Sequence, residues 1–584
     1  MWSTTKKCPR LGQWNGRRHS SRSDTLSISE LRKPDNLARL AVVLGSALVV
    51  TAMVFLFGPT MPYRVGEAYP YDLRVRVAFE VVNTARTAQL RTEIAEMQNG
   101  AIAEPVQAES PLIDHYKTGF VLVEREQPVT PEKFALLQAE NRAYVASLPW
   151  TTHFSRAAAL LLIVLLLTGV LVLYAVRFQK PLASSMSQVV GVCVIAITTV
   201  GCSLLLSPPP WQAMLVPLTV MAMVLTIAYN PPFALLISFS LALVINVTLG
   251  IRLVHFLVQM AGLATAVLML RDLRTRTRPV EVGLIAGLAY LAMNTAAGIL
   301  TQQSTNLILT DGCRYLIWGV LAGFILSGTI PWIERIFGIV TDVSLLELSD
   351  NSHPLLQELI KRAPGTYTHS MTVATLAESA ADAIQANSLL VRVGCYYHDI
   401  GKMMKPHYFI ENQNGKNRHD ELEPALSTLV IIGHVKDGMA LARQYNLPKP
   451  ISDFIQQHHG TTLVEYFYRE ALRLQECSPQ TAADLEFVFR YPGPKPQSRE
   501  AGILMLADAV ESASRALHLP TPSSIRKLVH DLMMKRLLDG QFDESNLTLT
   551  ELAKIEESLC KSLIAVYHHR IKYPACDEPR SQAG

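Results

Sequence analysis

The sequence has little charge for its length. Only 17% of its 584 residues are Asp, Glu, Lys or Arg, and 49% are hydrophobic, whereas an ordinary soluble domain has about 25% charged residues. This shortage argues against a simple cytosolic enzyme, and the high apolar content excludes a disordered chain. The formal net charge of +4 is too small to indicate binding of DNA or RNA, so neither is expected as a partner.

Cysteine is also scarce. The eight cysteines include no Cys-x-x-Cys pair, and none lies between residues 59 and 152. We therefore expect neither a disulfide framework nor a zinc site built from cysteine.

Long apolar runs dominate the first 330 residues. A membrane-spanning helix needs about 20 mostly apolar residues. Eight stretches qualify, and none of them contains Asp, Glu, Lys or Arg: 40–57, 157–176, 189–206, 211–228, 232–249, 253–270, 282–300 and 315–332. The sequence therefore predicts a multi-pass α-helical membrane protein with the lipid bilayer as a partner.

Basic residues near the spans predict the orientation. Residues 1–39 contain nine Lys or Arg against three acidic residues, so the N-terminus should stay in the cytoplasm. Eight crossings then return the C-terminus to the same side. We expect a basic cytoplasmic tail (1–39), a signal-anchor helix (40–57), an extracytoplasmic segment (58–156), a seven-helix transmembrane domain (157–333) and a cytoplasmic domain (334–584).

The two larger soluble parts differ in their apolar spacing. Apolar residues alternate over 73–82 and 120–126, which indicates strands, and a helical pattern covers 85–98. The extracytoplasmic segment is thus predicted to be a small α+β unit. From Glu334 onward the apolar spacing is helical, which predicts an all-α domain.

Histidine is concentrated in that all-α domain. Twelve of the sixteen histidines lie after residue 350, and several stand next to acidic residues. One buried histidine is usually a satisfied core residue, but five clusters together favour another interpretation. Imidazole and carboxylate form a ligand set for divalent metal ions. The clusters are centred on His369, His398-Asp399, His434, His458-His459 and Asp508.

Helical placement suggests how these side chains could share metal ions. We expect a helix over 389–397 that ends at His398, with the next residue, Asp399, turned by about 100°. One carboxylate has two oxygens, so Asp399 can bridge two metal ions. Ends and facing sides of helices are where bundles build such sites. We expect His434 to begin a helix, His458 and His459 to end the helix that starts near Pro450, and Asp508 to lie in a helix over 502–517.

The order His369, His398-Asp399, Asp508 resembles that of the HD-domain metal-dependent phosphohydrolases. Longer strings resemble one branch of them, the seven-transmembrane receptors with an intracellular HD hydrolase, whose bacterial members include cyclic-di-AMP phosphodiesterases. The strings are APGTYTHS (363–370), YYHDIGK (396–402), HVKDG (434–438), IQQHHGTTLVEYFY (455–468), YPGPKP (491–496) and MLADAVE (505–511).

The resemblance implies a fold, a reaction and a site. The fold is a multi-pass α-helical membrane protein with a cytoplasmic all-α HD-domain phosphohydrolase and a small extracytoplasmic α+β segment, located in the bacterial inner (cytoplasmic) membrane. The reaction is the hydrolysis of cyclic-di-AMP to 5′-pApA with two divalent metal ions, iron or manganese. One ion would be held by His369, His398, Asp399 and Asp508, and the other by Asp399, His434, His458 and His459. The expected catalytic residues are His398, Asp399 and Lys402. From its position one turn beyond the metal pair, and not from the resemblance, Lys402 is a candidate to stabilise phosphate charge, and Asp437 is a candidate to orient His434.

Other functions stay open at this point. The chain could hydrolyse another nucleotide, although TTLVEY follows His458-His459-Gly where the cyclic-di-GMP branch has Gly-Tyr-Pro. It could also be a receptor that binds a nucleotide without catalysis. Transport is disfavoured because no charge lies within the spans. A homodimer is an alternative to a single copy.

Two other regions carry separate hypotheses. The segment 58–156 resembles the beginning and end of a longer family domain without its middle, which makes a sensing role doubtful. The polar stretch 411–420 is a lid or an ordinary surface loop, and Tyr491 to Pro496 form a stiff connection that could border a nucleotide pocket.

Overall fold

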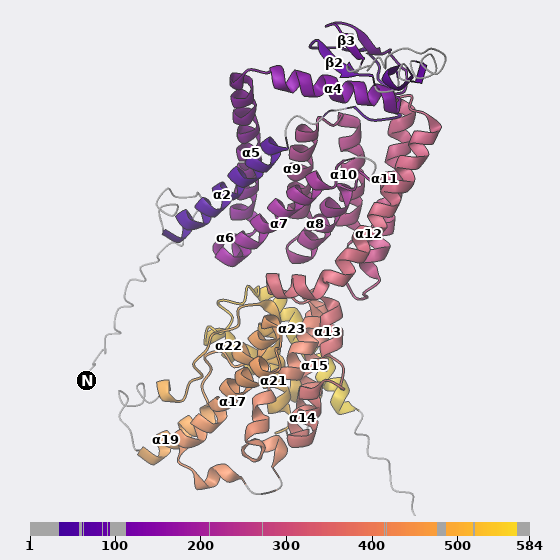
Figure 1. Cartoon of the computed structure of the whole chain (residues 1–584). Coiled ribbons are helices and arrows are strands. Elements are labelled where there is room, and N and C mark those ends of the chain that lie inside the picture. The colour runs from indigo at the N-terminus through magenta and orange to yellow at the C-terminus, as the bar shows by residue number, and fades with distance from the viewer. Residues whose placement is uncertain are drawn as a thin grey trace, which may run out of the picture. The chain divides into compact units, whose positions relative to one another are not determined.

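The computed structural model describes residues 34–57, 61, 63–83, 86–89, 92–93, 112–208, 211–270, 273–413, 415, 417–475, 486–517 and 520–568 (Figure 1). Most of the predicted basic tail (1–39) and much of the helix predicted over 85–98 lie outside these residues. The chain divides into two compact units, Met1–Met214 with Phe239–Phe256, and Leu215–Ser238 with Leu257–Gly584.

Three long apolar helices belong to the first unit. They are α2 (Pro34–Leu56), α5 (Trp150–Phe178) and α7 (Met186–Leu205), with the short α6 (Lys180–Ser184) between the last two. Helix α2 packs against both α5 and α7. Leu162, Leu166 and Leu173 of α5 are all more than 60% exposed, which is the arrangement expected of a helix that faces lipid.

The remaining apolar helices follow in sequence. They are α8 (Leu215–Ala228), α9 (Pro231–Leu249), α10 (Leu253–Met269), α11 (Arg278–Leu300) and α12 (Thr305–Phe337). Helices α11 and α12 cross where both carry glycine. A Cβ on Gly319 would lie 2.6 Å from the carbonyl oxygen of Gly283, so the two backbones meet closely, as small residues allow between membrane helices.

All eight predicted spans are helical, which confirms the multi-pass fold. Six of them are long and apolar enough to cross a membrane, and α8 and α10 are shorter, with 14 and 17 residues. A seventh long apolar helix is α17 (Pro424–Gln444). Because α17 carries Lys436, Asp437 and Arg443 and packs within the C-terminal helical domain, we assign it to that domain.

The segment between α2 and α5 contains short strands and a helix. Strand β1 (Leu73–Arg74) pairs antiparallel with β4 (Val121–Val123), and β2 (Phe79–Val82) pairs antiparallel with β3 (Ile113–Tyr116). Helix α4 (Pro131–Ser147) follows. The buried Glu140 of α4 accepts hydrogen bonds from the Arg76 side chain at 3.0 and 2.8 Å. The predicted α+β character is confirmed.

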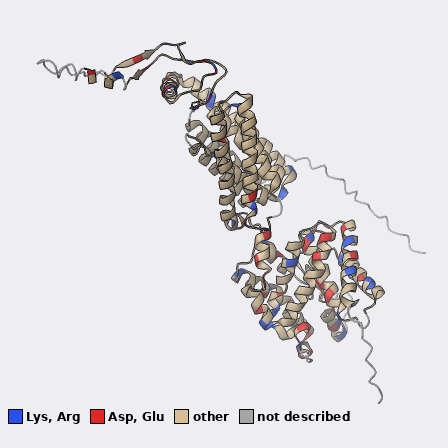
Figure 2. Ribbon diagram, turned by 90° about the vertical axis from the view of Figure 1, so that its right-hand side faces the viewer, with Lys and Arg blue, Asp and Glu red and all other residues tan. Residues whose placement is uncertain are grey.

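The described residues after α12 form a helical domain. Its helices are α13 (Asp342–Leu348), α14 (Pro354–Arg362), α15 (Pro364–Ala383), α16 (Ser388–Tyr397), α17, α18 (Lys449–Gln457), α19 (Glu465–Gln475), α21 (Arg499–Ser514), α22 (Pro522–Leu538) and α23 (Leu549–His568). Four 3-10 turns lie between α16 and α17: η1 (Ile400–Met404), η2 (Pro406–Tyr408), η3 (Ile410–Asn412) and η4 (Arg418–Glu421). Figure 2 shows charged residues spread over these helices and sparse on the apolar ones.

The core of this domain holds the site helices together. Helices α15, α16, α21, α22 and α23 contribute the apolar residues of its largest buried cluster, among them Val373, Val391, Leu504, Val529 and Ile555, each at most 1% exposed. Burying such side chains contributes about 1.5–3 kcal/mol each. This packing fixes α15, α16 and α21, which carry His369, His398 and Asp508.

Candidate metal centre

Helix α15 brings His369 into the interior. Pro364 stands in the first turn of the helix, where its missing N–H costs nothing, and His369 follows one turn later with 3% of its surface exposed. Its Nε2 lies 3.1 Å from Asp508 Oδ1, and its Nδ1 lies 2.6 Å from Glu511 Oε2. Both partners come from α21, as expected for Asp508.

The end of α16 supplies the His-Asp pair. The helix ends at its C-cap His398, and Asp399 follows before the turn η1. Asp399 Oδ2 lies 3.1 Å from His398 Nε2 and 3.6 Å from His369 Nε2. Asp399 Oδ1 lies 3.3 Å from His434 Nε2. The two carboxylate oxygens thus face different groups of ligands, which is the geometry that a bridging residue requires.

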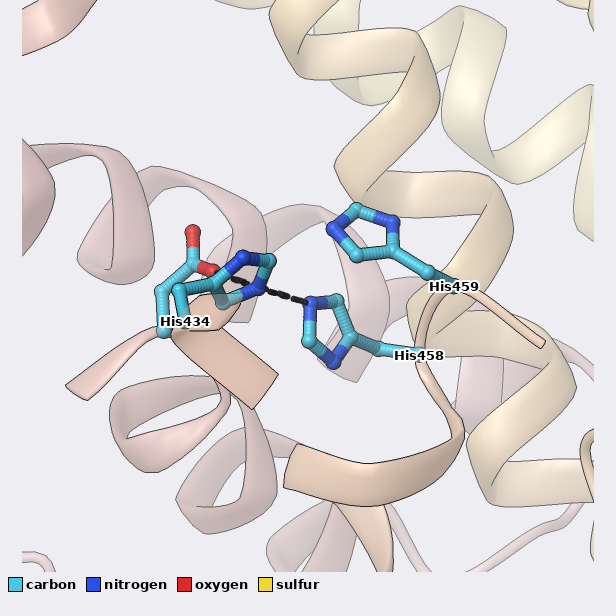
Figure 3. Close-up of side chains that lie close together, drawn as sticks. His434, His458 and His459 are labelled. Carbon is cyan, nitrogen blue, oxygen red and sulfur yellow. Dashed lines mark hydrogen bonds and ion pairs between the residues drawn. The ribbon is translucent and has the colours of Figure 1, made fainter. Parts of the chain in front are cut away.

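Three further histidines come from α17 and from the end of α18. Figure 3 shows the rings of His434, His458 and His459 converging, with His434 Nε2 3.3 Å from His458 Nε2. His458 caps the end of α18, as predicted. The expectation that His434 begins a helix is wrong, because α17 starts ten residues earlier at Pro424. Glu423 at the N-cap and Pro424 in the first turn set that earlier start.

The seven predicted ligands form two groups that share Asp399. Within each group the candidate ligand atoms all lie within 4.8 Å of one another. The groups are His369, His398, Asp399 and Asp508, and Asp399, His434, His458 and His459.

The donor set fits metal ions. His434 and His458 each approach a peptide carbonyl oxygen with Nδ1, at 2.5 and 2.9 Å. A carbonyl can accept but not donate, so Nδ1 carries the proton and the Nε2 lone pairs face one another and Asp399 Oδ1. Lone pairs that face each other repel unless a cation lies between them. Within the described part of the chain, His398 Nε2 and Asp399 Oδ1 are buried without a hydrogen-bond partner, which a metal ion would resolve.

The electrostatic environment of the site favours the deprotonated, metal-binding forms of Asp399 and His434 but not of His369. Burial raises the pKa of Asp399, but electrostatic interactions with His398 and Lys402 outweigh it and hold that pKa well below its usual range. Burial lowers the pKa of His434 to about 3, so its ring is neutral. Burial also opposes the charged form of His369, but hydrogen bonds to Asp508 and Glu511 raise its pKa to about 9. A metal ion must therefore displace a proton from His369.

Lys402 lies directly against the shared carboxylate. Its Nζ is 2.7 Å from Asp399 Oδ2 and 3.0 Å from Glu411 Oε1, and its side chain is 13% exposed. Burial opposes the charge of Lys402, but Asp399 and Glu411 raise its pKa above the usual range. Lys402 thus keeps a positive charge next to the candidate metal centre.

The first residues of the polar stretch 411–420 are hydrogen-bonded to α15. Asn412 Oδ1 accepts hydrogen bonds from the backbone N–H groups of Gly365 and Thr366, at 2.9 and 3.3 Å, and so caps that helix from outside. Glu411 Oε1 accepts from Thr366 Oγ1 at 3.0 Å. At the other end, His419 is buried and its Nε2 lies 2.9 Å from Tyr408 O. Asn414 and Lys416 lie outside the described residues.

Sequence reasoning missed two acidic partners and misassigned a third. Glu511 and Glu411 were not predicted, although Glu511 stands one helical turn after Asp508 and must share its face of α21. Asp437 was expected to orient His434, but Nδ1 of that histidine meets the Ile431 carbonyl oxygen instead. Tyr491 lies beside the site as suggested, with its ring centroid 4.3 Å from that of His459.

Two groups of histidines and aspartates that share one aspartate, placed within and at the ends of the helices of an all-α domain, define the class of HD-domain proteins. Comparison with sequence families agrees: an HD domain matches residues 366–513, and the family described as 7TM receptor with intracellular HD hydrolase matches residues 154–341. The chain belongs to this family of seven-transmembrane receptors with an intracellular HD hydrolase.

Two curated relatives share extensive sequence with the chain. It is 41% identical over 377 residues to the cyclic-di-AMP phosphodiesterase PgpH of Bacillus subtilis (strain 168), covering 62% of this chain and 51% of that protein. It is 44% identical over 318 residues to the protein of the same name from Listeria monocytogenes, covering 53% of this chain and 43% of that protein. The chain thus spans about half the length of the curated relatives it matches.

A solved structure is also similar in sequence. The HD domain of L. monocytogenes PgpH in complex with cyclic-di-AMP is 47% identical, and the match covers 38% of this chain and 100% of that chain, with a TM-score of 0.35.

Proposed function

We propose that this protein is a membrane-bound, metal-dependent phosphodiesterase that hydrolyses cyclic-di-AMP to 5′-pApA and thereby controls the level of a bacterial second messenger. The observation that carries the proposal is the pair of ligand groups that share Asp399. The names of the two curated relatives support cyclic-di-AMP as the substrate. Their longer chains leave room for differences outside the matched region.

Two divalent ions, iron or manganese, would occupy the two groups. His369, His398, Asp399 and Asp508 would hold one ion, and Asp399, His434, His458 and His459 would hold the other. Imidazole and carboxylate ligands suit both metals. A pair of metal ions in one site would activate a water molecule and neutralise phosphoryl oxygens in the displacement reaction.

The side chains of the site supply the rest of the chemistry. Hydrolysis forms a bond between water oxygen and phosphorus and breaks the bond from phosphorus to the ribose 3′-oxygen, which takes up a proton. Asp399 keeps the two ligand groups at a fixed separation, and His398 directs Nε2 into the site through the hydrogen bond from its Nδ1 to Cys395 O. Lys402 places a positive charge beside the shared carboxylate, where it would stabilise the phosphate as charge develops.

The rest of the chain would anchor this activity. We propose a basic cytoplasmic tail (1–39), a signal-anchor helix (40–57), a shortened extracytoplasmic domain (58–156), a seven-helix domain (157–333) and a cytoplasmic HD domain (334–584). The protein would lie in the bacterial cytoplasmic membrane with its catalytic domain in the cytoplasm. Dimerisation of the chain is an open alternative.

The test is hydrolysis by the full chain in detergent micelles. Cyclic-di-AMP and cyclic-di-GMP are offered separately with Mn²⁺ or Fe²⁺, and the product is identified by chromatography. Asp399→Ala is the inactive variant, and Asp382→Ala, which alters an exposed aspartate on α15, is the matched control. We expect metal-dependent 5′-pApA from the wild type and from Asp382→Ala, and none from Asp399→Ala.

Three results would contradict the proposal. Tight binding of cyclic-di-AMP without turnover in the presence of metal would make the protein a receptor. Faster hydrolysis of cyclic-di-GMP would assign another substrate. Hydrolysis by Asp399→Ala at the wild-type rate would place the activity elsewhere.

A further inference from the structure

The site histidines differ in what holds the ring nitrogen that faces away from the metal centre. In three of them, Nδ1 meets the carbonyl oxygen of the residue three positions earlier in its own helix. These pairs are His398 with Cys395 (2.7 Å), His434 with Ile431 (2.5 Å) and His458 with Ile455 (2.9 Å). A peptide carbonyl is neutral, so it orients the ring but adds no charge.

His369 is held by a carboxylate instead. Its Nδ1 lies 2.6 Å from Glu511 Oε2, and the Glu511 side chain is 5% exposed. Asp508, one turn earlier on α21, lies 3.1 Å from Nε2 on the other side of the ring. Helix α21 thus contributes a candidate ligand through Asp508 and the support of a second ligand through Glu511.

Arg515 completes this arrangement from the next turn of the chain. Its Nε and Nη2 donate to Glu511 Oε1 at 2.8 and 2.6 Å. Each oxygen of Glu511 therefore has its own partner, since Oε2 serves His369 and Oε1 serves Arg515. Two charge-assisted hydrogen bonds from one guanidinium to a single oxygen fix the orientation of the carboxylate. Arg515 is 42% exposed, so it can be changed without opening the core.

We propose that Glu511, fixed by Arg515, is a positioning residue that makes the metal position of His369 and Asp508 the tighter of the two. This inference rests on the proposed metal centre and not on the identity of the substrate. The tighter position would have two carboxylates, Asp399 and Asp508, and a third negative charge acting through His369. The other position would have Asp399 and three histidines.

The physical basis is the polarisation of the imidazole. A carboxylate that accepts the Nδ1 proton makes Nε2 more basic and fixes the ring, and loss of such a partner typically lowers metal affinity about 10–100-fold. Lys402 contacts Asp399 Oδ2, the oxygen that faces His369 and His398. Its positive charge would therefore repel a metal ion bound at that position. Glu411 lies 3.0 Å from Lys402 Nζ and offsets that charge.

The test measures metal binding rather than turnover. Full chain in detergent is freed of metal with a chelator and dialysed against graded Mn²⁺, and the bound metal per chain is counted. We expect two classes of site in the wild type. His434→Ala should remove the weaker class and so assign it.

The variants then separate charge from structure. Glu511→Ala should weaken the tighter class about 10–100-fold and change the weaker class less than about twofold. Glu511→Gln keeps a hydrogen-bond acceptor but loses the charge, so the affinity of the tighter class should fall less than in Glu511→Ala. Arg515→Met should also lower the affinity of the tighter class. Glu500→Gln is the matched control, because Glu500 stands on the same helix and accepts a hydrogen bond from Asn387 N.

Two outcomes would overturn the inference. Wild-type affinities in Glu511→Ala would show that the carboxylate does not act on the metal, and equal weakening of both classes would show a merely structural role. If Glu511→Ala fails to fold, judged by its melting curve and gel filtration, the metal affinities of Glu511→Gln and Arg515→Met test the inference in its place. Two ions bound by a wild type that does not hydrolyse cyclic-di-AMP would contradict the proposed function and leave this inference intact.

Discussion

Replacing Gly401 with alanine should damage the site without touching a ligand. Gly401 lies in η1, between Asp399 and Lys402, where the turn meets α17. A Cβ at this position would lie 1.9 Å from the carbonyl oxygen of His434 and 2.5 Å from Gly438 N, whereas ordinary contact begins at 3.4 Å. The obstacles are backbone atoms, so η1 and α17 themselves must separate.

The size of that movement gives the expected loss. Relieving the overlap with His434 requires a shift of roughly 1.5 Å. Asp399 directly precedes η1, and its Oδ1 lies 3.3 Å from His434 Nε2 on α17. The shift would therefore pull the shared carboxylate away from the ligand group that contains His434. Displacements of about 1 Å in an active site cost about 100-fold in rate, and overpacking costs about 1–3 kcal/mol of stability.

Gly433→Ala is the matched control. Gly433 precedes His434 in α17, and among the described residues nothing lies within 4 Å of a Cβ built there. Alanine should stabilise this helix by up to about 1 kcal/mol and leave turnover unchanged. The assay compares cyclic-di-AMP hydrolysis, bound metal and melting temperature in both variants. Wild-type turnover and two bound ions in Gly401→Ala would refute the reasoning that the close approach sets the ligand geometry.

Three further predictions concern charge. Lys402→Met should lower turnover about 100-fold with two ions still bound in metal analysis, and unchanged turnover would contradict its role. Because the pKa of His369 is raised to about 9 in the metal-free protein, metal uptake at pH 7 should release its proton. Affinity should then rise from pH 7 to about pH 9 and level off above, as titration in weak buffer would show; a flat profile would contradict this. Asp437→Ala should keep turnover within twofold, since Ile431 O orients His434. A large loss of turnover would instead support the sequence-based expectation that Asp437 orients His434.

Much of the fold could be predicted from the sequence because the signals are strong. Apolar runs of about 20 residues without charge have few outcomes other than a membrane helix. Length and mean hydropathy, taken without regard to charge, would also mark α17 as a span, although its His434 belongs to a buried polar site. The charged residues Lys436, Asp437 and Arg443 of α17 and its packing within the C-terminal helical domain separate it from the predicted spans.

The ligands could be predicted for a similar reason. Histidine and aspartate are costly to bury, so their repetition around apolar helical segments points to a shared purpose. Their partners could not be predicted in the same way. Glu511 stands 142 residues after His369. Glu411 stands only nine residues after Lys402, but the short 3-10 turns between them carry no periodic signal that would bring the two side chains together.

A dinuclear centre bridged by Asp399 can be tested by following metal binding and activity in one titration. Mn²⁺ is added stepwise to metal-free full chain, and bound metal and cyclic-di-AMP hydrolysis are measured on the same samples. We expect two ions per chain, with turnover appearing as the second ion binds, and neither two ions nor turnover in Asp399→Ala. Full turnover with one ion bound, or two ions bound by Asp399→Ala, would contradict a dinuclear centre bridged by this residue.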